Sequence, residues 1–450
     1  MVKNDIIPLR IESITNEGAG VGRYDGMVVF VPFAAVGDEL EVRIVKTAGS
    51  YCYGRIEKIK VPSDCRVSPD CPAFGKCGGC VFRHISYEAE LEAKSEMIRS
   101  AFTRIGGLDP EFLPIIPNSN VTGYRNKAQY PVGRDKDGNT VCGFFAQRSH
   151  RIIPCEGCLL EPPVFDEIRA AALELIVTHR ISPYNEEQHN GVMRHICIRR
   201  GHYSGEINVV LVVRRNVPEL KKIAAALAEK FPDIRGIVAN INKERTNVIY
   251  GSENITLYGT PEITDTMLGK RFVISPKSFY QVNTPMAERL YTEAAKLAEP
   301  DGKTLIDLYC GIGTVGISIG GSTAKLIGAE IVPDAVENAR KNAELNGFAD
   351  AEFYCGDAGK VTSLLREKGI KADVVTVDPA RKGCDRATLD NIVSFAPERI
   401  VMISCEPATA ARDCKYLGQH GYRTVSVRGV DLFSRTNHVE AVILMTRAEK

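Results

Sequence analysis

The stretch TLIDLYCGIGTVGISIG, Thr304 to Gly320, gives the clearest indication of fold in this 450-residue chain. An apolar run of the kind found in buried strands leads into Gly311, Gly313 and Gly316, after which a helical pattern begins. Glycines at such positions permit a tight turn and let a ligand approach the backbone at the end of a strand. The stretch predicts a nucleotide-type loop in an open α/β sheet, although alone it also fits a plain glycine-rich turn or a dinucleotide site.

Apolar runs alternate with helical patterns around and after this loop. The runs read TLIDLYC, AKLIGAEI, ADVVTVD and RIVMISC. Strands that alternate with helices predict a mostly parallel sheet that is covered on both faces. Residues 261–450 are therefore expected to form a Rossmann-like α/β domain.

Carboxylates stand at the ends of the first three of these runs, and another follows a further expected strand that ends in YCGDA, between AKLIGAEI and ADVVTVD. The four acids are Asp307, Glu330, Asp357 and Asp378. They should gather at the carboxyl edge of the sheet, where open α/β sheets bind ligands, and Glu330 stands about 20 positions after the loop, where an acid can hold ribose hydroxyls. A hydride-transfer enzyme does not need this row of acids. The row suits S-adenosylmethionine, which offers a ribose, an adenine amine and an ammonium group.

A thiol follows the next expected strand, in the stretch IVMISCEPATAARD. Cys405 should lie beside Asp378 beyond the same edge, and Asp431 and Glu440 return acids to this edge before a last strand. A nucleophile with a nearby acid or base is the minimum for covalent catalysis. The alternative is a structural cysteine, because a free thiol packs like a small hydrophobic group. We assign that structural role to Cys310, Cys355, Cys384 and Cys414.

The N-terminal half has a different organisation. Residues 1–61 alternate short β-type runs with glycine-containing turns and predict a small barrel. Residues 62–260 join a Cys-, Gly- and Pro-rich loop to helical and β-type patterns, which predicts an α+β middle domain. Within it, a helix near 86–107 with Ser86 as its cap is a candidate to pack on the catalytic domain.

Composition narrows the classes of function. Hydrophobic residues at 44% are ordinary for a globular protein, and no apolar run approaches the roughly 20 residues that cross a bilayer. The start of the chain lacks the pattern of an export signal, which predicts a cytoplasmic protein with reduced cysteines. Because 57 Lys and Arg nearly cancel 56 Asp and Glu, binding to nucleic acid must use local patches. We expect a monomer without membrane contacts.

Basic residues form three such patches, interleaved with Tyr and Phe. Patches of this kind can hold phosphates while aromatic rings stack on unpaired bases, although each one alone is also typical of a solvated face. The neighbouring barrel favours RNA as the partner. The patches are Arg148, His150 and Arg151; Arg194, His195, Arg199 and Arg200; and Arg214 and Arg215.

Cysteines cluster in two separated stretches. CPAFGKCGGC supplies Cys71, Cys77 and Cys80, and RIIPCEGCLL supplies Cys155 and Cys158. Three thiols in a glycine-rich loop with a distant fourth predict a four-thiolate site, either for zinc or for an iron–sulfur cluster. Unliganded thiols in such a cluster would be prone to oxidation, which disfavours a metal-free alternative.

The motifs DLYCGIGT, VDPAR, SCEPAT and NHVE resemble those of the RNA 5-methyluridine methyltransferase family, and almost the whole chain is similar to its bacterial 23S ribosomal RNA branch. Residues 6–61 resemble the OB-like, RNA-binding TRAM domain that precedes many members. The resemblance implies a class I S-adenosylmethionine-dependent methyltransferase that modifies C5 of a uridine. It favours 23S rRNA over tRNA, because the tRNA branch generally lacks the barrel and the cysteine cluster.

The resemblance also implies roles for single residues. Cys405 would be the nucleophile that adds to C6 of a uracil splayed out of its stack, and Glu440 would be the base that removes the C5 proton. The cofactor site would comprise Gln281, Tyr309, Gly311, Thr314, Glu330, Asp357 and Asp378. A [4Fe-4S] cluster would be held by Cys71, Cys77, Cys80 and Cys158, with Cys155 as the alternative fourth ligand.

The chain departs from the family pattern in two places. It has SCEP where SCNP is usual, and DPAR where DPPR is usual. The first change puts Glu406 beside the nucleophile, where a carboxylate is expected to raise the pKa of the thiol and slow its attack. The rival functions are a methyltransferase for tRNA, one for a small molecule or protein, which would not need the barrel, and a non-catalytic iron–sulfur RNA-binding protein.

Overall fold

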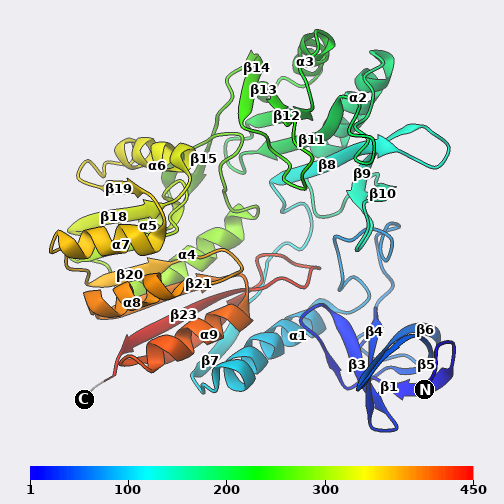
Figure 1. Ribbon diagram of the computed structural model, residues 1–450, viewed down its shortest axis with the longest axis horizontal. Coiled ribbons are helices and arrows are strands. Elements are labelled where there is room, and N and C mark those ends of the chain that lie inside the picture. Colours follow the sequence, from blue (N-terminus) through cyan, green and yellow to red (C-terminus); the bar gives the residue numbers. More distant parts are fainter. Residues whose placement is uncertain (449–450) are drawn as a thin grey trace.

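A computed structural model describes residues 1–448 of the chain. Figure 1 shows a small β-rich body at the N-terminus, a middle sheet with helices, and a larger α/β body that contains the C-terminal half. Within the described residues, none of the helices combines the length and the apolar character needed to cross a membrane.

The N-terminal body, which we call the barrel, is a six-stranded sheet in the order β1-β5-β6-β4-β3-β2. Burial alternates along its strands, as in β5, where Leu40, Val42 and Ile44 point into the core. This is the period-2 pattern of a sheet with one buried face. Its strands are β1 (Ile6–Arg10), β2 (Ser13–Ile14), β3 (Ala19–Tyr24), β4 (Met27–Pro32), β5 (Glu39–Ala48) and β6 (Tyr51–Val61).

The middle body contains a seven-stranded sheet in the order β10-β9-β8-β11-β12-β13-β14. Every residue of β12 is buried, as expected for a central strand with both faces covered. Its strands are β8 (Lys127–Arg134), β9 (Thr140–Phe145), β10 (Ile152–Pro154), β11 (Met193–Arg200), β12 (Ile207–Val213), β13 (Ile234–Ile241) and β14 (Glu253–Gly259). Its helices are α2 (Pro163–Thr178) and α3 (Glu219–Lys230).

The C-terminal body contains an eight-stranded sheet in the order β19-β18-β17-β20-β21-β23-β22-β7. The five strands from β19 to β21 in this order run parallel, and β23 is antiparallel to both of its neighbours. Two apolar cores cover its two faces, which is the doubly wound arrangement that the alternating pattern predicts. The strands are β17 (Thr304–Leu308), β18 (Lys325–Glu330), β19 (Glu352–Cys355), β20 (Val374–Val377), β21 (Arg399–Ser404), β22 (Tyr422–Val430) and β23 (Glu440–Arg447).

Helices connect these strands across both faces of the sheet (Figure 1). They are α4 (Thr284–Ala298), α5 (Thr314–Ile319), α6 (Pro333–Leu345), α7 (Ala358–Glu367), α8 (Arg386–Phe395) and α9 (Pro407–Gly418). A two-stranded ribbon precedes α4, made of β15 (Ile263–Met267) and β16 (Lys270–Ile274).

A segment from the N-terminal half completes the eight-stranded sheet. Helix α1 (Tyr87–Ser100) begins at the predicted cap, where Ser86 Oγ accepts a hydrogen bond from Ala89 N at 3.2 Å. The helical turns of η1 (Ala101–Gly106) follow and contact α9. Strand β7 (Glu111–Ile116) then pairs in parallel with β22. This part of the predicted middle domain therefore lies on the eight-stranded sheet.

Candidate active site

The glycine-rich loop leaves β17 in a left-handed conformation. Tyr309 has φ 64°, Gly311 has φ 56° and Gly313 has φ 84°. A positive φ is unusual for a residue as bulky as tyrosine, and such local strain is typical of ligand-binding turns. A side chain added at Gly311 would meet no atom within 4 Å, so the loop borders open space at this point.

Two of the predicted acids hold the loop in place. Asp307 is buried, and its carboxylate accepts hydrogen bonds from Gly316 N at 2.8 Å and Thr376 Oγ1 at 2.9 Å. Its role is therefore structural, and it does not belong to a row of ligand-facing acids. Glu330 accepts a hydrogen bond from Gly311 N at 3.1 Å, which fixes its carboxylate beside the glycine that borders open space.

Gln281 is the most telling member of the predicted cofactor site. Its side chain is 3% exposed, and its Oε1 has no hydrogen-bond partner. A buried amide oxygen without a hydrogen-bond partner destabilises the folded protein, and a ligand that donates a hydrogen bond to this oxygen would remove that cost. Thr314 is also buried, at the start of α5. These features fit a ligand with hydrogen-bond donors beside the loop.

The remaining predicted cofactor residues, Asp357, Tyr309 and Asp378, each contact other parts of the C-terminal body. Asp357 caps α7, with Oδ1 accepting a hydrogen bond from Lys360 N at 3.3 Å. The ring of Tyr309 packs against one of the two apolar cores, and burial raises the pKa of its hydroxyl. Asp378 directly follows β20, and its N donates to Leu308 O at 3.3 Å, which brings it next to the loop.

Strand pairing brings Cys405 and Glu440 to adjoining strand ends. Ser404 and Ala441 are the last paired residues of the antiparallel strands β21 and β23. Cys405 directly follows this pair on β21, and Glu440 directly precedes it on β23. Glu440 is buried and Cys405 is partly buried. The thiol and the carboxyl are close enough for the charge of Glu440 to act on Cys405.

Burial makes the acids of this site titrate near neutral pH. It raises the pKa of Glu440 to about 8, and the charge of Asp378 adds to this effect. It also raises the pKa of Asp378 to about 7, together with the charge of Asp307. A carboxyl group whose pKa lies near the working pH is well suited to accept a proton during turnover.

The same surroundings disfavour the thiolate form of Cys405. Burial raises the pKa of its thiol to about 11, and the charges of Glu440 and Asp378 contribute in the same direction. The positive charge of Arg381 opposes the rise. The main charges that raise this pKa are thus Glu440 and Asp378, and the expected contribution of Glu406 is not among the principal causes.

Asp431 is not available for catalysis, contrary to the expectation from its position near the edge. Its Oδ1 accepts a hydrogen bond from Lys94 Nζ at 2.6 Å, and its Oδ2 accepts from Tyr87 and Ser434 hydroxyls, each at 2.6 Å. Lys94 also donates to Glu90 at 2.8 Å, and all three charged side chains are fully buried. This network, which the sequence did not reveal, fastens α1 to the segment that leads into β23.

Cys405 opens into a cleft of about 770 Å³ between the C-terminal body and the barrel. The C-terminal body contributes Arg381, Cys405 and His438 to the lining of the cleft. The barrel contributes residues 12–17 and Arg23, and η1 contributes Arg104. His438 Nε2 lies 3.2 Å from Arg381 Nη2, and burial together with this cation lowers the pKa of His438 to about 4. The thiol of Cys405 therefore borders a space large enough for a nucleotide.

The predicted cysteine ligands also line one cavity, of about 450 Å³. Cys77 Sγ accepts from Gly79 N at 3.3 Å, and Cys80 Sγ accepts from Arg83 Nε at 3.4 Å. Such donors suit thiolates that bind a metal cluster. Among residues 1–448, however, no three or more His, Cys, Asp or Glu side chains lie close enough together to hold a metal ion. The cysteines that line this cavity are Cys71, Cys77, Cys80, Cys155 and Cys158.

Two arginines of the predicted RNA-binding patches are structural instead. Arg194 is 4% exposed and donates to the carbonyl oxygens of Asn242, Glu244 and Thr246. Arg199 is 6% exposed and donates to Ser278 O at 2.6 Å. Sequence patterns cannot separate such buried cations from surface ones. The patch around Arg148 is exposed.

Comparison with known families decides the class of this protein. The family model described as tRNA (uracil-5-)-methyltransferase matches residues 86–448, and the TRAM domain model matches residues 3–56. The chain belongs to the tRNA (uracil-5-)-methyltransferase family. It is therefore an S-adenosylmethionine-dependent RNA methyltransferase that acts on C5 of uracil. The resemblance in the motifs is confirmed, and so is the class I methyltransferase fold.

Relatives of this family match the chain along its whole length. A protein of Bacillus cereus named as an RNA methyltransferase is 41% identical over 451 residues, covering 100% of this chain and 98% of its own. One of Halalkalibacterium halodurans is also 41% identical, covering 98% of this chain and 97% of its own. The solved structure of the Pyrococcus abyssi tRNA (uracil-54, C5)-methyltransferase with S-adenosyl-L-homocysteine has a TM-score of 0.78 at 26% identity, and covers 98% of this chain and 100% of that one.

The last comparison bears on the choice of RNA. Because the match covers 98% of the chain, it extends through the barrel as well as the catalytic sheet. A tRNA enzyme can thus share this architecture, and the barrel does not by itself distinguish rRNA from tRNA enzymes.

Proposed function

We propose that this enzyme methylates C5 of a uridine in a single-stranded loop of 23S rRNA through a covalent adduct with Cys405. The observation that carries the proposal is the position of Cys405 and Glu440 at the adjoining ends of β21 and β23, with Cys405 at the wall of an open cleft. This arrangement supports Cys405 as the nucleophile and Glu440 as the base. Loop nucleotides are preferred because a base that is already unstacked costs less to bring into the cleft.

The reaction requires the thiol first and the carboxylate last. The thiol of Cys405 first loses its proton to solvent; the thiolate then adds to C6 of the uracil, and the electron pair of the C5–C6 bond moves toward O4 to give an enolate. C5 of the enolate then takes the methyl group that the donor supplies. Glu440 removes the remaining C5 proton, the C5–C6 double bond re-forms, and the thiolate leaves. Arg381 favours the first step, because its charge lowers the pKa of Cys405.

The methyl donor is proposed to bind between the glycine-rich loop and the ends of β17, β18 and β20. Gln281 would supply its free amide oxygen, Glu330 its fixed carboxylate, and Gly311 a close approach to the backbone. The remaining residues of the proposed donor site are Tyr309, Thr314, Asp357 and Asp378.

Cys71, Cys77, Cys80 and Cys158 are proposed to hold a [4Fe-4S] cluster, supported by their shared cavity and by the donors to the sulfurs of Cys77 and Cys80. A bound cluster would organise the loop that carries three of these thiols. Methyl transfer to uracil needs no electron transfer, so the proposed role is structural. We further propose that the enzyme works as a cytoplasmic monomer.

A second candidate substrate is tRNA, which is favoured by the likeness to the Pyrococcus abyssi enzyme. The two candidates are separated by mapping 5-methyluridine in 23S rRNA and in bulk tRNA from a strain without this gene and from the complemented strain. The proposal predicts that a 23S rRNA position loses its methyl group while the tRNA stays unchanged. Loss from tRNA alone would contradict the choice of rRNA, and no change in either would contradict the proposed function.

A further inference from the structure

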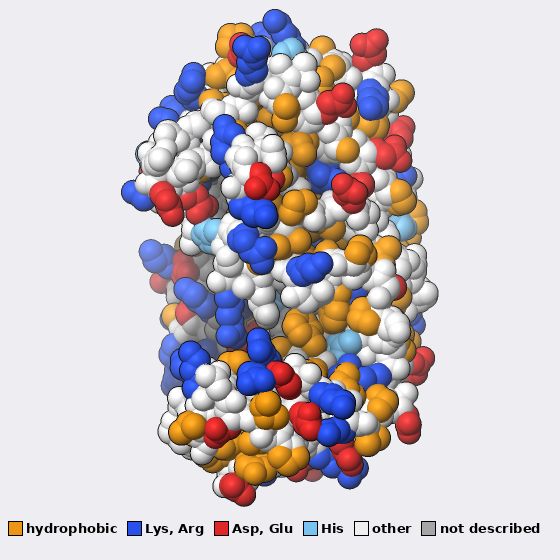
Figure 2. Space-filling view, turned by 90° about the vertical axis from the view of Figure 1, so that its right-hand side faces the viewer, with side chains coloured by type: hydrophobic (Ala, Val, Ile, Leu, Met, Phe, Trp, Pro, Cys, Tyr) orange, Lys and Arg blue, Asp and Glu red, His pale blue; other side chains and the backbone are white. Residues whose placement is uncertain are grey.

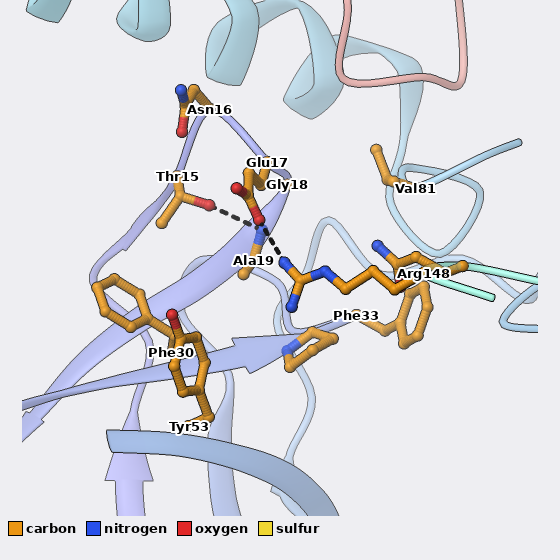
Figure 3. A pocket seen from close by; sticks show the side chains of 12 residues that line it. Thr15, Asn16, Glu17, Gly18, Ala19, Phe30, Phe33, Tyr53, Val81 and Arg148 are labelled. Carbon is orange, nitrogen blue, oxygen red and sulfur yellow. Dashed lines mark hydrogen bonds and ion pairs between the residues drawn. The ribbon is translucent and has the colours of Figure 1, made fainter. Parts of the chain in front are cut away.

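A second, smaller pocket lies between the barrel and the turn that joins β9 to β10. Its volume is about 260 Å³. This lies below the roughly 300–1,000 Å³ of sites for drug-sized ligands, so it suits one flat group rather than an extended molecule. Figure 3 shows the rings of Phe30 and Tyr53 on one side and the side chain of Arg148 reaching across from the other side.

Aromatic rings make up much of the pocket. The ring centroids of Phe30 and Tyr53 are 5.7 Å apart, and both rings remain partly exposed. Phe33 lies below Arg148 (Figure 3) and has φ 60°, which is uncommon for an aromatic residue and is held by a hydrogen bond from Arg66 Nη2 to Phe33 O at 3.0 Å. Exposed rings held in fixed positions form a surface on which a nucleobase can stack.

Arg148 borders the pocket and forms an exposed ion pair with Glu17 that a ligand could replace. Its Nη2 lies 2.8 Å from Glu17 Oε2, and the two side chains are 72% and 69% exposed. An exposed ion pair of this kind contributes at most about 1 kcal/mol. A phosphate group could therefore take the place of the Glu17 carboxylate, because guanidinium binds phosphate with good geometry. Figure 2 shows further Lys and Arg side chains around the hollow between the two halves of this face.

One loop separates this pocket from the cleft that contains Cys405. Thr15, Asn16 and Glu17 line both spaces. The loop is fastened to the catalytic body, since Asn437 Nδ2 donates to Asn16 O at 3.0 Å, three residues before Glu440. An RNA strand that leaves a uridine at Cys405 therefore reaches the pocket by crossing this single loop.

We infer that the pocket binds an unpaired nucleotide that neighbours the target uridine, with its base against Phe30 and Tyr53 and its phosphate on Arg148. The inference rests on the proposed function for the position of the target. Stacking of this kind tolerates any base, so the pocket would set the strand's path and register rather than read its sequence.

The test compares variants of the full chain in their binding to the RNA that the wild type methylates, either a 23S rRNA fragment or a tRNA transcript. Tyr53→Leu and Phe30→Leu should raise the Kd about 5- to 150-fold, the range expected for loss of one stacked base. Tyr53→Phe keeps the ring and should bind like the wild type. Tyr51→Leu is the matched control: Tyr51 lies 5.7 Å from Phe30 and is exposed, but it does not line the pocket.

Two further measurements localise the nucleotide. A single abasic position next to the target should weaken binding to the wild type and have no added effect with Tyr53→Leu. Arg148→Gln should lower the slope of log Kd against log salt by about 0.7, one phosphate contact on a single strand. Equal binding by Tyr53→Leu and the wild type, or an equal loss with Tyr51→Leu, would overturn the inference. Failure of the proposed function would show differently, as no methyl transfer by the wild type to 23S rRNA.

Discussion

Replacing Lys94 by Met should loosen the segment that leads into the active site. The Lys94 ammonium is fully buried and donates to Glu90 Oε1 at 2.8 Å, to Asp431 Oδ1 at 2.6 Å and to Phe433 O at 3.1 Å. Met fills a similar volume without the charge, so the two buried carboxylates would lose the cation between them, and Arg435 Nη1, 3.5 Å from Glu90 Oε2, would remain near Glu90. Breaking a buried pair in this way costs roughly 3–5 kcal/mol.

The cost should depend on pH. Burial already raises the pKa of Glu90, and loss of Lys94 removes a charge that lowers it. Glu90 can then stay protonated in the variant at pH 5, which relieves the repulsion, whereas at pH 8 it must ionise or hold a costly proton. The destabilisation of Lys94→Met is therefore expected to be larger at pH 8 than at pH 5.

Hydrogen exchange read by mass spectrometry measures this effect locally, because Arg435 N donates to Glu90 Oε1 at 2.6 Å and reports on the network. Peptides spanning 431–439 should exchange much faster in Lys94→Met. Arg99→Met is the control, since it removes the same charge from an exposed position of α1, where the guanidinium lies over the ring of Phe112. Equal exchange in Lys94→Met and Arg99→Met would refute the structural role of the network.

Three further predictions concern the thiols and the acids. Arg381 lowers the pKa of the Cys405 thiol, so in Arg381→Gln the alkylation of Cys405 by iodoacetamide should require a higher pH. Peptide mass spectrometry measures the extent of alkylation at each pH, and a shift to lower pH would contradict this role of Arg381. The folded-state pKa of Glu440 is raised to about 8 from the ordinary 4.5, so the wild type loses stability as pH rises through this window, and Glu440→Gln should gain melting temperature relative to it between pH 5 and pH 9. A difference that does not change with pH would count against the buried acid. Anaerobically purified protein should be brown and contain iron, and Cys77→Ser should lose both, whereas one equivalent of zinc without iron would refute the cluster.

The order of elements in the catalytic sheet could be predicted because each strand carries its own signal. Gly311 and its neighbours mark the first turn, and the apolar runs that follow are long enough to specify buried parallel strands. The pairing of β7 with β22 could not be predicted. Glu111–Ile116 is a short strand whose partner lies more than 300 positions away, and nothing local specifies that contact.

The candidate site shows the same division. Cys405 and Glu440 each flank an apolar run, so their convergence at one edge follows from strand order. The burial of Lys94 could not be predicted, because the pattern SYEAELEAKSEMIRS is typical of a helix with solvated charges and the partner Asp431 is distant in the sequence. The prediction that Arg194 and Arg199 lie on the surface was wrong. Their partners are backbone carbonyl oxygens, which every residue has, so no side-chain pattern indicates these contacts.

The proposed mechanism is tested most sharply by the fate of the adduct in Glu440→Gln. If Glu440 takes the C5 proton, this variant should add Cys405 to the uracil and transfer one methyl group, then stall. The expected result is a protein–RNA conjugate that survives denaturing electrophoresis and carries label from the methyl donor, and that is absent when Cys405→Ala is added. Release of methylated RNA by Glu440→Gln at the rate of the wild type, or a labelled conjugate that persists without Cys405, would contradict the proposed mechanism.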